Sequence, residues 1–398
     1  MQLDSIQLEA VNRAVSLPFS ITTGGAGTGK TTIIDNMTRE LTARGESVSL
    51  VAFAGKAAAR LREACRYPSS TIHRMLQYNG VGFGAGDLDD QSIIVDEASM
   101  IPAELMSEIV SRNPRRLVLV GDQAQLPPVG KGQPFHDLLD LRPDLVTNLT
   151  TCYRATEAVY KAANAIRNGE RPPMQENSPN ESWRAINTGD PDRTQAVIMD
   201  WVKGGMLDFS QDIILCPRNG DNPEQAATVE GLNAAISEHF RPGTKPLDFS
   251  SGDRVINTKN MPEKDVWNGT SGTVHAVDID GGVWVTTDVP VIDHNQTTDE
   301  MQPVYTDKVF FTKTERKSLQ LAYALTVHKA QGSQYRRVLY ACLNRDSFAL
   351  LDRSLTYTAV TRTRAACCVV GELAAFWRSI ETVKHRRTIL QELANKAA

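Results

Sequence analysis

A glycine-rich run near the start of the chain has the spacing of a phosphate-binding loop. Residues 24–31 read Gly-Gly-Ala-Gly-Thr-Gly-Lys-Thr, which fits the pattern Gly-x-x-x-x-Gly-Lys-Ser/Thr. Glycines let successive backbone N–H groups curl around phosphate oxygens, and the first turn of a following helix adds partial positive charge. We expect Lys30 to reach the β- and γ-phosphates of a nucleotide and Thr31 to offer its hydroxyl to Mg²⁺. The other loop residues expected at the nucleotide are Gly25, Ala26, Gly27, Thr28, Gly29 and Thr32.

Two carboxylates follow the apolar run at 92–95, which predicts a buried strand. Asp96 would hold Mg²⁺, and Glu97 would orient or deprotonate the attacking water. A strand that ends in two acids is common, so the pair alone means little. Beside a phosphate-binding loop it indicates hydrolysis, because a protein that only holds a nucleotide needs no residue to activate water.

Strands and helices must position these residues, and the apolar pattern predicts both. Short apolar runs alternate with segments of helical period, which favours an α/β fold with parallel sheets. A first series comprises strands at 19–22, 49–54, 92–95 and 117–120, a helix with Ile33, Ile34, Met37 and Leu41 inward, and a helix opened by Pro102. A second series comprises strands at 213–215, 338–341 and 367–370 and a helix with Val229, Leu232 and Ile236 inward.

Two segments interrupt this alternation. Residues 78–87 contain four glycines in ten positions and predict a short hairpin or loop. The stretch 248–317 contains two runs, 272–278 and 283–288, that alternate around Gly281-Gly282 as an antiparallel hairpin would. We therefore expect a small β domain inserted into the second α/β domain.

The overall composition sets broad limits. The 398 residues are 41% hydrophobic and 23% charged, which is enough apolar material for more than one core. The net charge of −4 gives no global positive field, so any nucleic-acid binding must use local basic patches. No apolar run approaches the roughly 20 residues of a membrane span, and the first residues carry no basic leader. We expect a cytoplasmic protein with no membrane partner, its six scattered cysteines being reduced thiols.

Several motifs resemble those of superfamily 1B helicases, the RecD-like and phage Dda-like group. Residues 96–100 (Asp-Glu-Ala-Ser-Met) and 121–130 (Gly-Asp-Gln-Ala-Gln-Leu-Pro-Pro-Val-Gly) resemble motifs II and III. Residues 53–61 resemble motif Ia and 71–74 the segment after it, while 325–333 resembles motif V and 355–364 motif VI. The resemblance is strong over 1–130 and 318–372 and weak between. Motifs in the right order are more specific than any one of them.

The resemblance implies a domain plan. Two RecA-like parallel-sheet motor domains are expected, with a short hairpin in the first and a small SH3-like β domain in the second. The expected boundaries are 1–76 and 90–147 for the first motor domain, 77–89 for the hairpin, 148–247 and 318–398 for the second motor domain, and 248–317 for the SH3-like domain.

The resemblance also implies roles at the ATP site. Gln125 would sense the γ-phosphate, and Arg362 and Arg154 would act as arginine fingers reaching in from the second motor domain. Each arginine, taken without its motif, would more commonly form a salt bridge. Gln7 would read the adenine, or be an exposed polar residue on an N-terminal helix. Tyr153 would stack on the base, or be a buried core tyrosine. Gln331 and Gly332 are placed at the nucleotide by the same resemblance.

Strand binding is implied on both motor domains. The expected DNA contacts are Phe53, Lys56 and His73 on the first and Thr326, His328 and Lys329 on the second, the two histidines having capping or core roles as alternatives. In relatives a hairpin between motifs Ia and II parts the duplex, and Phe83 is the candidate wedge here. The two basic runs at 336–337 and 384–387 are more typical of solvated faces. The sequence departs from the family pattern at Ala155 and Gln334, which puts one nucleotide or strand contact in doubt.

The expected function is ATP- and Mg²⁺-dependent movement along single-stranded DNA with unwinding of fork DNA, 5′ to 3′ if the family pattern holds. Two alternatives stay open: a translocase that displaces proteins without separating strands, and a nucleotide-gated binding module. The expected partners are DNA and a single-strand-binding or replication protein, with the protein itself a monomer. Such a chain fits a stand-alone accessory helicase, acting in the host cytoplasm if it is phage-encoded.

Overall fold

The computed structural model describes residues 3–153, 157–243, 248–297, 303–346 and 350–384, together with Arg386, Thr388 and Leu390. The chain forms two compact units, which are described separately below. Unit 1 comprises Met1–Thr156 and Val383–Ala398, and unit 2 comprises Glu157–Thr382. Within the described residues, no helix is both long and apolar enough to cross a membrane.

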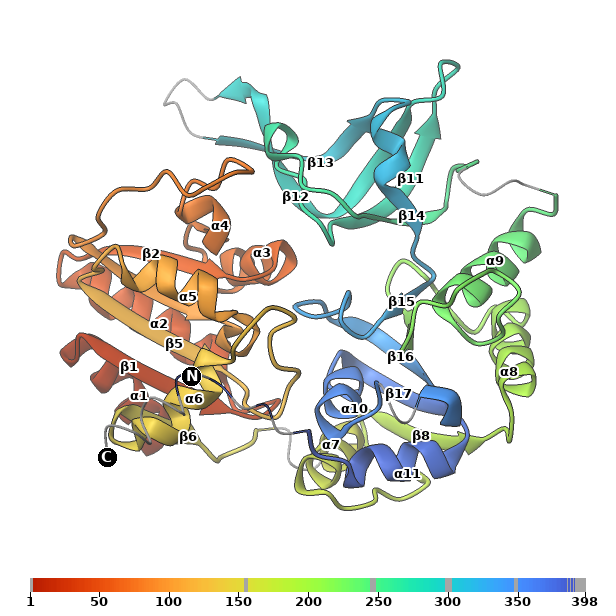
Figure 1. The fold of residues 1–398 in the computed structure, drawn as a ribbon, viewed down its shortest axis with the longest axis horizontal. Helices are drawn as coiled ribbons and strands as arrows, with labels where there is room; N and C mark the ends of the chain where they lie inside the picture. The colour runs from red at the N-terminus through yellow and green to blue at the C-terminus, as the bar shows by residue number, and fades with distance from the viewer. Residues whose placement is uncertain are drawn as a thin grey trace. The chain divides into compact units, whose positions relative to one another are not determined.

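Unit 1 is built on a six-stranded parallel sheet in the order β3-β2-β4-β5-β1-β6 (Figure 1). Its strands are β1 (Phe19–Gly24), β2 (Ser47–Ala52), β3 (Ser69–Thr71), β4 (Gln91–Asp96), β5 (Arg116–Gly121) and β6 (Val146–Leu149). The four strands expected here from the apolar runs are confirmed. Parallel strands have apolar side chains on both faces, because helices cover both faces of the sheet.

Helices sandwich this sheet. They are α1 (Ser5–Ser16), α2 (Lys30–Ala43), α3 (Gly55–Cys65), α4 (Ile72–Met75), η1 (Ala98–Met100), α5 (Ala103–Val110), α6 (Pro134–Leu141) and η2 (Pro143–Leu145). One core cluster packs α1, α2 and α3 onto the side of Leu50 and Ile94. The other packs α5 and Phe135 of α6 onto the side of Val51 and Ile93. The helix expected after Pro102 is confirmed, with Pro102 as its N-cap residue.

Unit 2 contains a second six-stranded sheet, in the order β15-β9-β16-β17-β8-β7, parallel except for the edge strand β7. The strands are β7 (Gln175–Asn177), β8 (Ser182–Asn187), β9 (Ile213–Cys216), β15 (Ala324–Thr326), β16 (Tyr335–Cys342) and β17 (Thr363–Gly371). The helices are α7 (Ala158–Asn168), α8 (Pro191–Lys203), α9 (Val229–Phe240), η5 (Asn344–Asp346), α10 (Arg353–Val360) and α11 (Leu373–Glu381). The expected inward face of α9, with Val229, Leu232 and Ile236, is confirmed.

A five-stranded antiparallel sheet is inserted in unit 2, in the order β13-β12-β11-β10-β14. It comprises β10 (Arg254–Asn257), η3 (Pro262–Lys264), β11 (Ser271–Val277), β12 (Val283–Thr297), β13 (Pro303–Phe311), η4 (Glu315–Ser318) and β14 (Leu319–Leu321). The expected hairpin is β11–β12, and β14 follows the expected end at 317. Buried Asp253 ties this sheet to α9, because it pairs with Arg241 (2.6 Å) and accepts the Tyr323 hydroxyl (2.7 Å).

The chain returns to unit 1 after α11. Residues from Val383 onward belong to unit 1, so unit 2 is an insertion in the sequence of unit 1. Two side chains anchor this returning segment: Thr388 is 8% exposed, and Arg386 donates through Nη1 to the Pro128 carbonyl (2.7 Å). The basic run at 384–387 therefore includes at least one residue with a structural contact.

Candidate functional site

Three neighbouring strands of unit 1 end at the same edge of its sheet. In the order β4-β5-β1, β1 leads into the glycine-rich loop, β4 ends at Asp96, and β5 leads into the run that starts at Gly121. Ligands of open α/β sheets bind outside the carboxyl ends of the strands. The topology therefore brings the three predicted motifs together.

The glycine-rich loop passes from β1 into α2 as expected. Lys30 is the first residue of α2, and its Nζ donates to the carbonyls of Gly24 (2.8 Å) and Gly25 (2.9 Å). The ammonium group thus lies over the loop at which it is predicted to contact the phosphates. Gly29 has a left-handed backbone (φ +82°), and a Cβ there would lie 2.5 Å from Nε2 of Gln7. The left-handed backbone favours glycine at this position, and a larger residue would also displace the Gln7 amide.

Gln7 and Tyr153 flank this loop. Gln7 is 4% exposed, and its Nε2 donates to the Thr28 carbonyl (3.2 Å), so it is not the exposed helix residue of the alternative interpretation. Tyr153 is 48% exposed, which excludes the alternative of a core tyrosine. Its backbone N–H donates to Gly27 O (3.1 Å), and its hydroxyl donates to Asp4 Oδ2 (2.8 Å). An exposed aromatic ring therefore lies at the edge of the loop.

The acids at the end of β4 are buried. Asp96 and Glu97 are each 7% exposed, and Glu97 Oε2 has no hydrogen-bond partner among the described residues. Burial, with the neighbouring Glu97 carboxylate, raises the pKa of Asp96 to about 6, although Lys30 and Arg60 act against this. Glu97 also has a left-handed backbone (φ +52°), a strained conformation for a non-glycine residue that is often found at functional sites.

This arrangement fits a nucleotide with Mg²⁺. Two adjacent buried carboxylates with an unsatisfied oxygen favour a cation beside them. Mg²⁺ takes only one or two protein carboxylates and completes its shell with phosphates and water. Among the described residues, no group of three or more His, Cys, Asp or Glu side chains is placed to hold a metal ion.

Gln125 lies on the third loop. It is 6% exposed, and its Nε2 is 3.4 Å from Oδ2 of the fully buried Asp122. Asp122 also accepts the Ala124 N–H (3.0 Å), so one carboxylate shapes the turn that carries Gln125. The carbonyl of Pro128, further along the same loop, accepts the bond from Arg386.

Unit 2 carries the remaining predicted nucleotide residues. Arg362 follows α10, is 3% exposed, and donates through Nε to the Thr358 carbonyl (3.1 Å). Gln331 and Gly332 lie in the turn after β15. Arg154 lies outside the described residues. The roles of these four residues at the nucleotide remain predictions.

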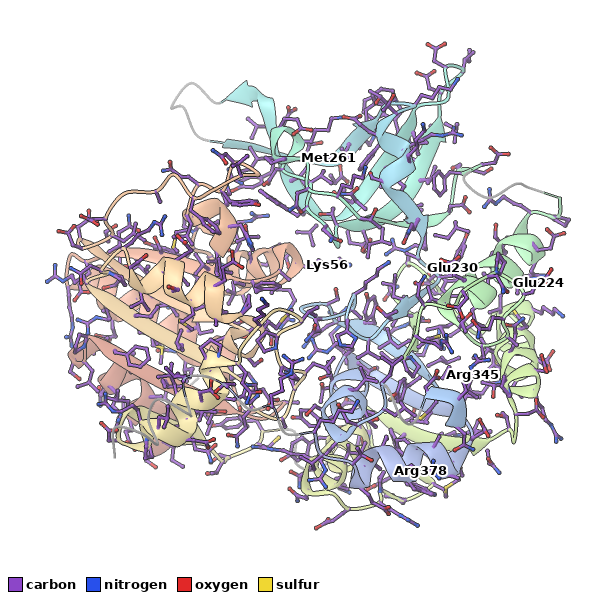
Figure 2. The ribbon with its side chains drawn as sticks, viewed as in Figure 1. Lys56, Glu224, Glu230, Met261, Arg345 and Arg378 are labelled. Carbon is purple, nitrogen blue, oxygen red and sulfur yellow. The ribbon has the colours of Figure 1, made fainter. Side chains whose placement is uncertain are left out.

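An aromatic cluster in unit 1 contains three of the predicted strand contacts. His73, on α4, is 6.0 Å from Phe53 and 6.1 Å from Phe83 between ring centroids, and burial lowers its pKa. Phe83 also lies 4.9 Å from Tyr78 and beneath the Arg112 guanidinium (5.9 Å). Lys56 stands on the first turn of α3 (Figure 2).

The segment expected to be a short hairpin or loop is a tight turn. Tyr78 and Phe83 form an isolated antiparallel bridge, and Asn79 Oδ1 accepts the N–H groups of Val81 and Gly82 (3.0 Å each). Phe83, the expected wedge, packs against the core of unit 1. Val81 is instead 95% exposed at the tip of the turn.

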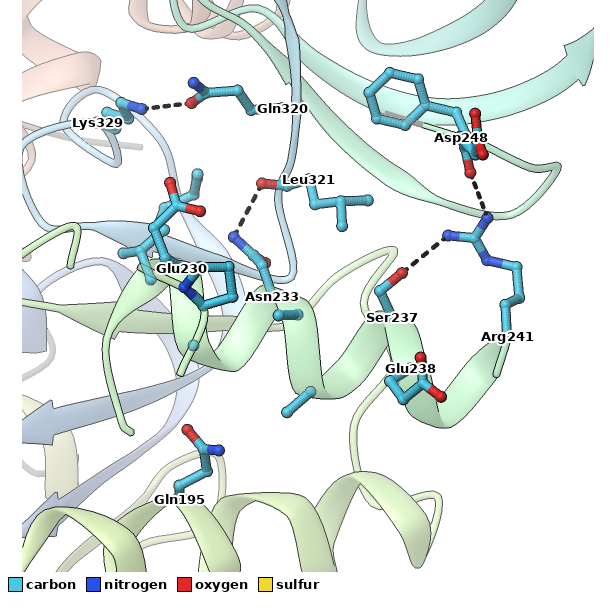
Figure 3. Close-up of a pocket in the computed structure, with 17 residues that line it drawn as sticks. Gln195, Glu230, Asn233, Ser237, Glu238, Arg241, Asp248, Gln320, Leu321 and Lys329 are labelled. Atoms are coloured by element: carbon cyan, nitrogen blue, oxygen red, sulfur yellow. Dashed lines mark hydrogen bonds between the residues drawn. The ribbon is translucent and has the colours of Figure 1, made fainter. Parts of the chain in front are cut away.

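The predicted strand contacts of unit 2 follow β15. Thr326 Oγ1 accepts the Lys329 N–H (3.2 Å), and the His328 carbonyl accepts the Gln331 N–H (3.2 Å). Lys329 Nζ donates to Gln320 Oε1 (3.0 Å) and lines a cavity of about 540 Å³ along α9 (Figure 3). Burial lowers the pKa of Lys329. Lys329 therefore points toward the inserted sheet's last strand in this structure.

Sequence reasoning missed two residues at these sites. Asp4 caps α1 and positions both Gln7 and Tyr153, and its hydrogen bond from the Gln7 N–H lowers its pKa. The Asp-x-x-Gln spacing of a capping box was the signal for it. Ser99, inside the quoted motif II, is fully buried, and no described residue hydrogen-bonds its hydroxyl. Nothing in its sequence spacing indicates that.

Comparisons with known proteins agree with this geometry. Residues 2–187 match the family described as an AAA domain, and residues 321–370 match the UvrD-like helicase C-terminal domain. The ATP-dependent RecD2 DNA helicase of Deinococcus radiodurans is 32% identical over 395 residues. The RecD subunit of the RecBCD enzyme of Mycolicibacterium smegmatis is 29% identical over 436 residues, covering 97% of this chain.

The coverage is uneven. The match to the Deinococcus protein covers 94% of this chain but only 50% of that protein. The match to the Mycolicibacterium subunit covers 74% of that subunit. A solved Pif1 helicase from Bacteroides, in complex with ADP-AlF3 and single-stranded DNA, superposes with a TM-score of 0.59 at 18% identity, covering 100% of this chain and 98% of that one. At that identity the match establishes the fold alone.

The proteins named above include no phage protein and no Dda helicase, so that part of the predicted resemblance is unsupported. The RecD-like part is supported by both family matches and by relatives aligned along nearly the whole chain. Along nearly its whole length the chain is similar to the RecD-like helicases of superfamily 1B.

Proposed function

We propose that this protein couples ATP hydrolysis to movement along single-stranded DNA and separates duplex DNA at forks. Two lines of support converge on this proposal. The Deinococcus relative is a DNA helicase by name, and the phosphate loop, the acid pair and the Gln125 loop share one sheet edge. Direction is carried over from the family pattern as 5′ to 3′.

The residues of unit 1 divide the chemistry among them. The loop N–H groups and Lys30 bind and orient the phosphates, while Thr31 and Asp96 hold Mg²⁺, which when bound neutralises phosphate charge. Glu97 accepts the proton of the attacking water through its unpartnered oxygen. Tyr153 and Gln7 flank the base, and Gln125 reports the presence of the γ-phosphate.

Unit 2 completes the cycle in this proposal. Arg362 and Arg154 stabilise the transferring phosphoryl group when unit 2 closes on ATP, so that closing and opening move two strand-binding surfaces. Phe53, Lys56 and His73 form one surface, and Thr326, His328 and Lys329 form the other. The two motor domains correspond to units 1 and 2, so the second begins at Glu157 rather than at residue 148 and ends at Thr382 rather than at residue 398. The inserted sheet has an SH3-like identity in this proposal. The protein acts as a monomer with a single-strand-binding or replication protein nearby.

One observation supports hydrolysis most directly: the buried, unsatisfied Glu97 carboxylate beside Asp96. We expect Glu97→Gln to lower strand-stimulated ATP turnover by about 10²–10⁴ while leaving ATP affinity within a few fold. Turnover with and without an oligothymidylate, and binding of a fluorescent ATP analogue, test this. Glu104→Gln, at an exposed acid of α5, is the matched control. Stimulated turnover that survives Glu97→Gln would contradict the proposal.

A second candidate, a translocase that does not separate strands, is favoured by the small turn at 78–83. The Phe83 ring packs inward, and the apolar side chain exposed at the tip is the small Val81. A forked duplex with a 5′ tail distinguishes the two functions. Strand separation together with stimulated turnover supports a helicase. Stimulated turnover without separation supports the translocase.

A further inference from the structure

The outer face of the inserted sheet carries an exposed aromatic pair. Trp284 on β12 is 41% exposed and is the register partner of Phe310 on β13. Their ring centroids lie 5.0 Å apart at 42°. The adjacent residues Val283 and Val285 point into the core and are 0% and 3% exposed. Strand alternation therefore places the aromatic pair outside, where it contributes little to that core.

Three basic residues of the inserted sheet lie near this pair in the fold. Lys308 lies two residues before Phe310 and so shares its face, opposite Thr286. Arg316 donates through Nη1 to the Gly281 carbonyl (3.0 Å), and the Lys313 side chain is 3.8 Å from the Cβ position of Gly281, just before Trp284 in the chain. Neither lysine forms an ion pair with any residue that the structure describes. Arg316 also lies 3.9 Å from the Asp248 carboxylate, and the acids of the hairpin tip are Asp278 and Asp280.

We propose that this face, which we call the Trp284 face, binds single-stranded DNA by stacking an unpaired base on Trp284. The cations attract the phosphates that flank that base. Stacking platforms bordered by basic side chains are the usual way to hold single strands without sequence preference. Protein interfaces, by contrast, are depleted in lysine. The face therefore matches a nucleic-acid strand better than a protein partner.

The proposal rests on the proposed function, since it adds a contact outside the two strand-binding surfaces described above. A short strand would occupy only those two surfaces. A longer strand would also reach the Trp284 face and gain affinity from it.

The test is equilibrium binding of fluorescein-labelled oligothymidylates of about 8 and about 30 nucleotides to the full chain, without nucleotide. We expect Trp284→Ala to weaken binding of the longer strand by about tenfold and to leave the shorter one unchanged. Trp284→Phe, which keeps an aromatic ring, should retain most of the affinity. Ile279→Ala, at a residue that is 100% exposed on the hairpin tip, removes apolar area without a ring and should have no effect.

Wild-type affinity of Trp284→Ala for the longer strand would overturn the inference and leave the face to another class of partner. If Trp284→Ala unfolds at a lower temperature than the wild type, the double variant Lys308→Ala/Lys313→Ala decides instead. It should reduce the salt dependence of binding to the longer strand alone, and an unchanged salt dependence would also overturn the inference. Failure of the proposed function is distinguishable, because it appears as unstimulated ATP turnover rather than as altered strand affinity.

Discussion

The two six-stranded sheets have the same construction but different carboxyl edges. In unit 1, β1 leads into a glycine-rich loop and β4 ends on two acids. In unit 2, the central strands β9 and β16 each end on a buried cysteine, and Pro217 and Leu343 follow. No glycine loop follows either strand, so unit 2 has no backbone cradle for phosphates at those positions. The architecture alone does not create a nucleotide site.

A buried acid occurs at the carboxyl edge of each sheet. Asp346, in η5 after β16, is 2% exposed, and neither of its oxygens has a hydrogen-bond partner among the described residues. Burial raises its pKa to about 6, against the opposing charges of Arg345 and Arg218, whose Nε is 4.0 Å away. Asp96 has a similarly raised pKa, but its neighbours are the phosphate loop and Glu97. A raised pKa therefore indicates burial in both cases, and only Asp96 has a glycine-rich loop beside it.

The largest effect is expected from the arginine that unit 2 contributes. Arg362→Ala should lower strand-stimulated ATP turnover by about 10³ or more, because an arginine finger stabilises charge that develops only in the transition state. Steady-state turnover with saturating oligothymidylate measures this. Arg364→Ala, at an exposed arginine two residues away, is the control. If both variants lost activity equally, Arg362 would have only a structural role.

A paired substitution compares the two acids directly. Asp96→Asn should lower turnover by about 10² or more, because it removes a metal ligand and leaves Glu97 unsupported. Asp346→Asn should leave turnover within about twofold of the wild type, since no phosphate-binding element is associated with it. The measurement is ATP turnover over a range of Mg²⁺ concentrations. A loss of activity in Asp346→Asn would mean that the edge of unit 2 also takes part in the reaction.

The smallest effect concerns stability. The pKa of Asp346 is about 6 in the folded protein, compared with 3.8 for an aspartate side chain exposed to water. The folded state therefore binds the proton more tightly than the unfolded state. The free energy of unfolding should therefore fall as pH rises from about 4 to about 6 and stay lower above that range. Asp346→Asn removes this penalty. Its free energy of unfolding, compared with that of the wild type, should therefore be more favourable at pH 7.5 than at pH 4.5 by about 1 kcal/mol.

Urea unfolding at the two pH values, followed by tryptophan fluorescence, measures the difference. Asp280→Asn, at an exposed acid of the inserted sheet, is the control. If Asp346→Asn changed the free energy of unfolding equally at both pH values, ionisation of the Asp346 carboxyl group would not destabilise the folded protein.

The strands and the phosphate loop were predictable because each depends on a short local pattern. An apolar run that ends in Asp-Glu specifies a buried strand and the position of its acids, and the glycine spacing specifies the loop. The orientation of Phe83 was harder to predict, because an exposed aromatic wedge and an inward-packed aromatic ring have the same residue type. Its orientation is decided by contacts with Tyr78 of the same turn, with His73 of the preceding helix and with Arg112 of a distant segment. No local pattern contains that information.

The same reasoning applies to other side chains whose surroundings depend on tertiary packing. Both the exposure of Tyr153 and the isolation of Glu97 Oε2 depend on what long-range packing leaves beside them. Arg336 and Arg337 give the opposite example, since they resembled a solvated face but both bind the buried carboxylate of Asp212. Local sequence identified which groups could react, and tertiary packing decided which of them are satisfied.

Because unit 2 is inserted in the sequence of unit 1, unit 1 cannot be completed until the ribosome has finished both. The segment that buries Thr388 and bonds the Pro128 carbonyl is synthesised after all of unit 2. During translation the loop that carries Gln125 therefore lacks one of its anchors while unit 2 is being made. A protease cut between the units at residues 154–156 would likewise leave them joined, because a second peptide connection remains at residues 382–383.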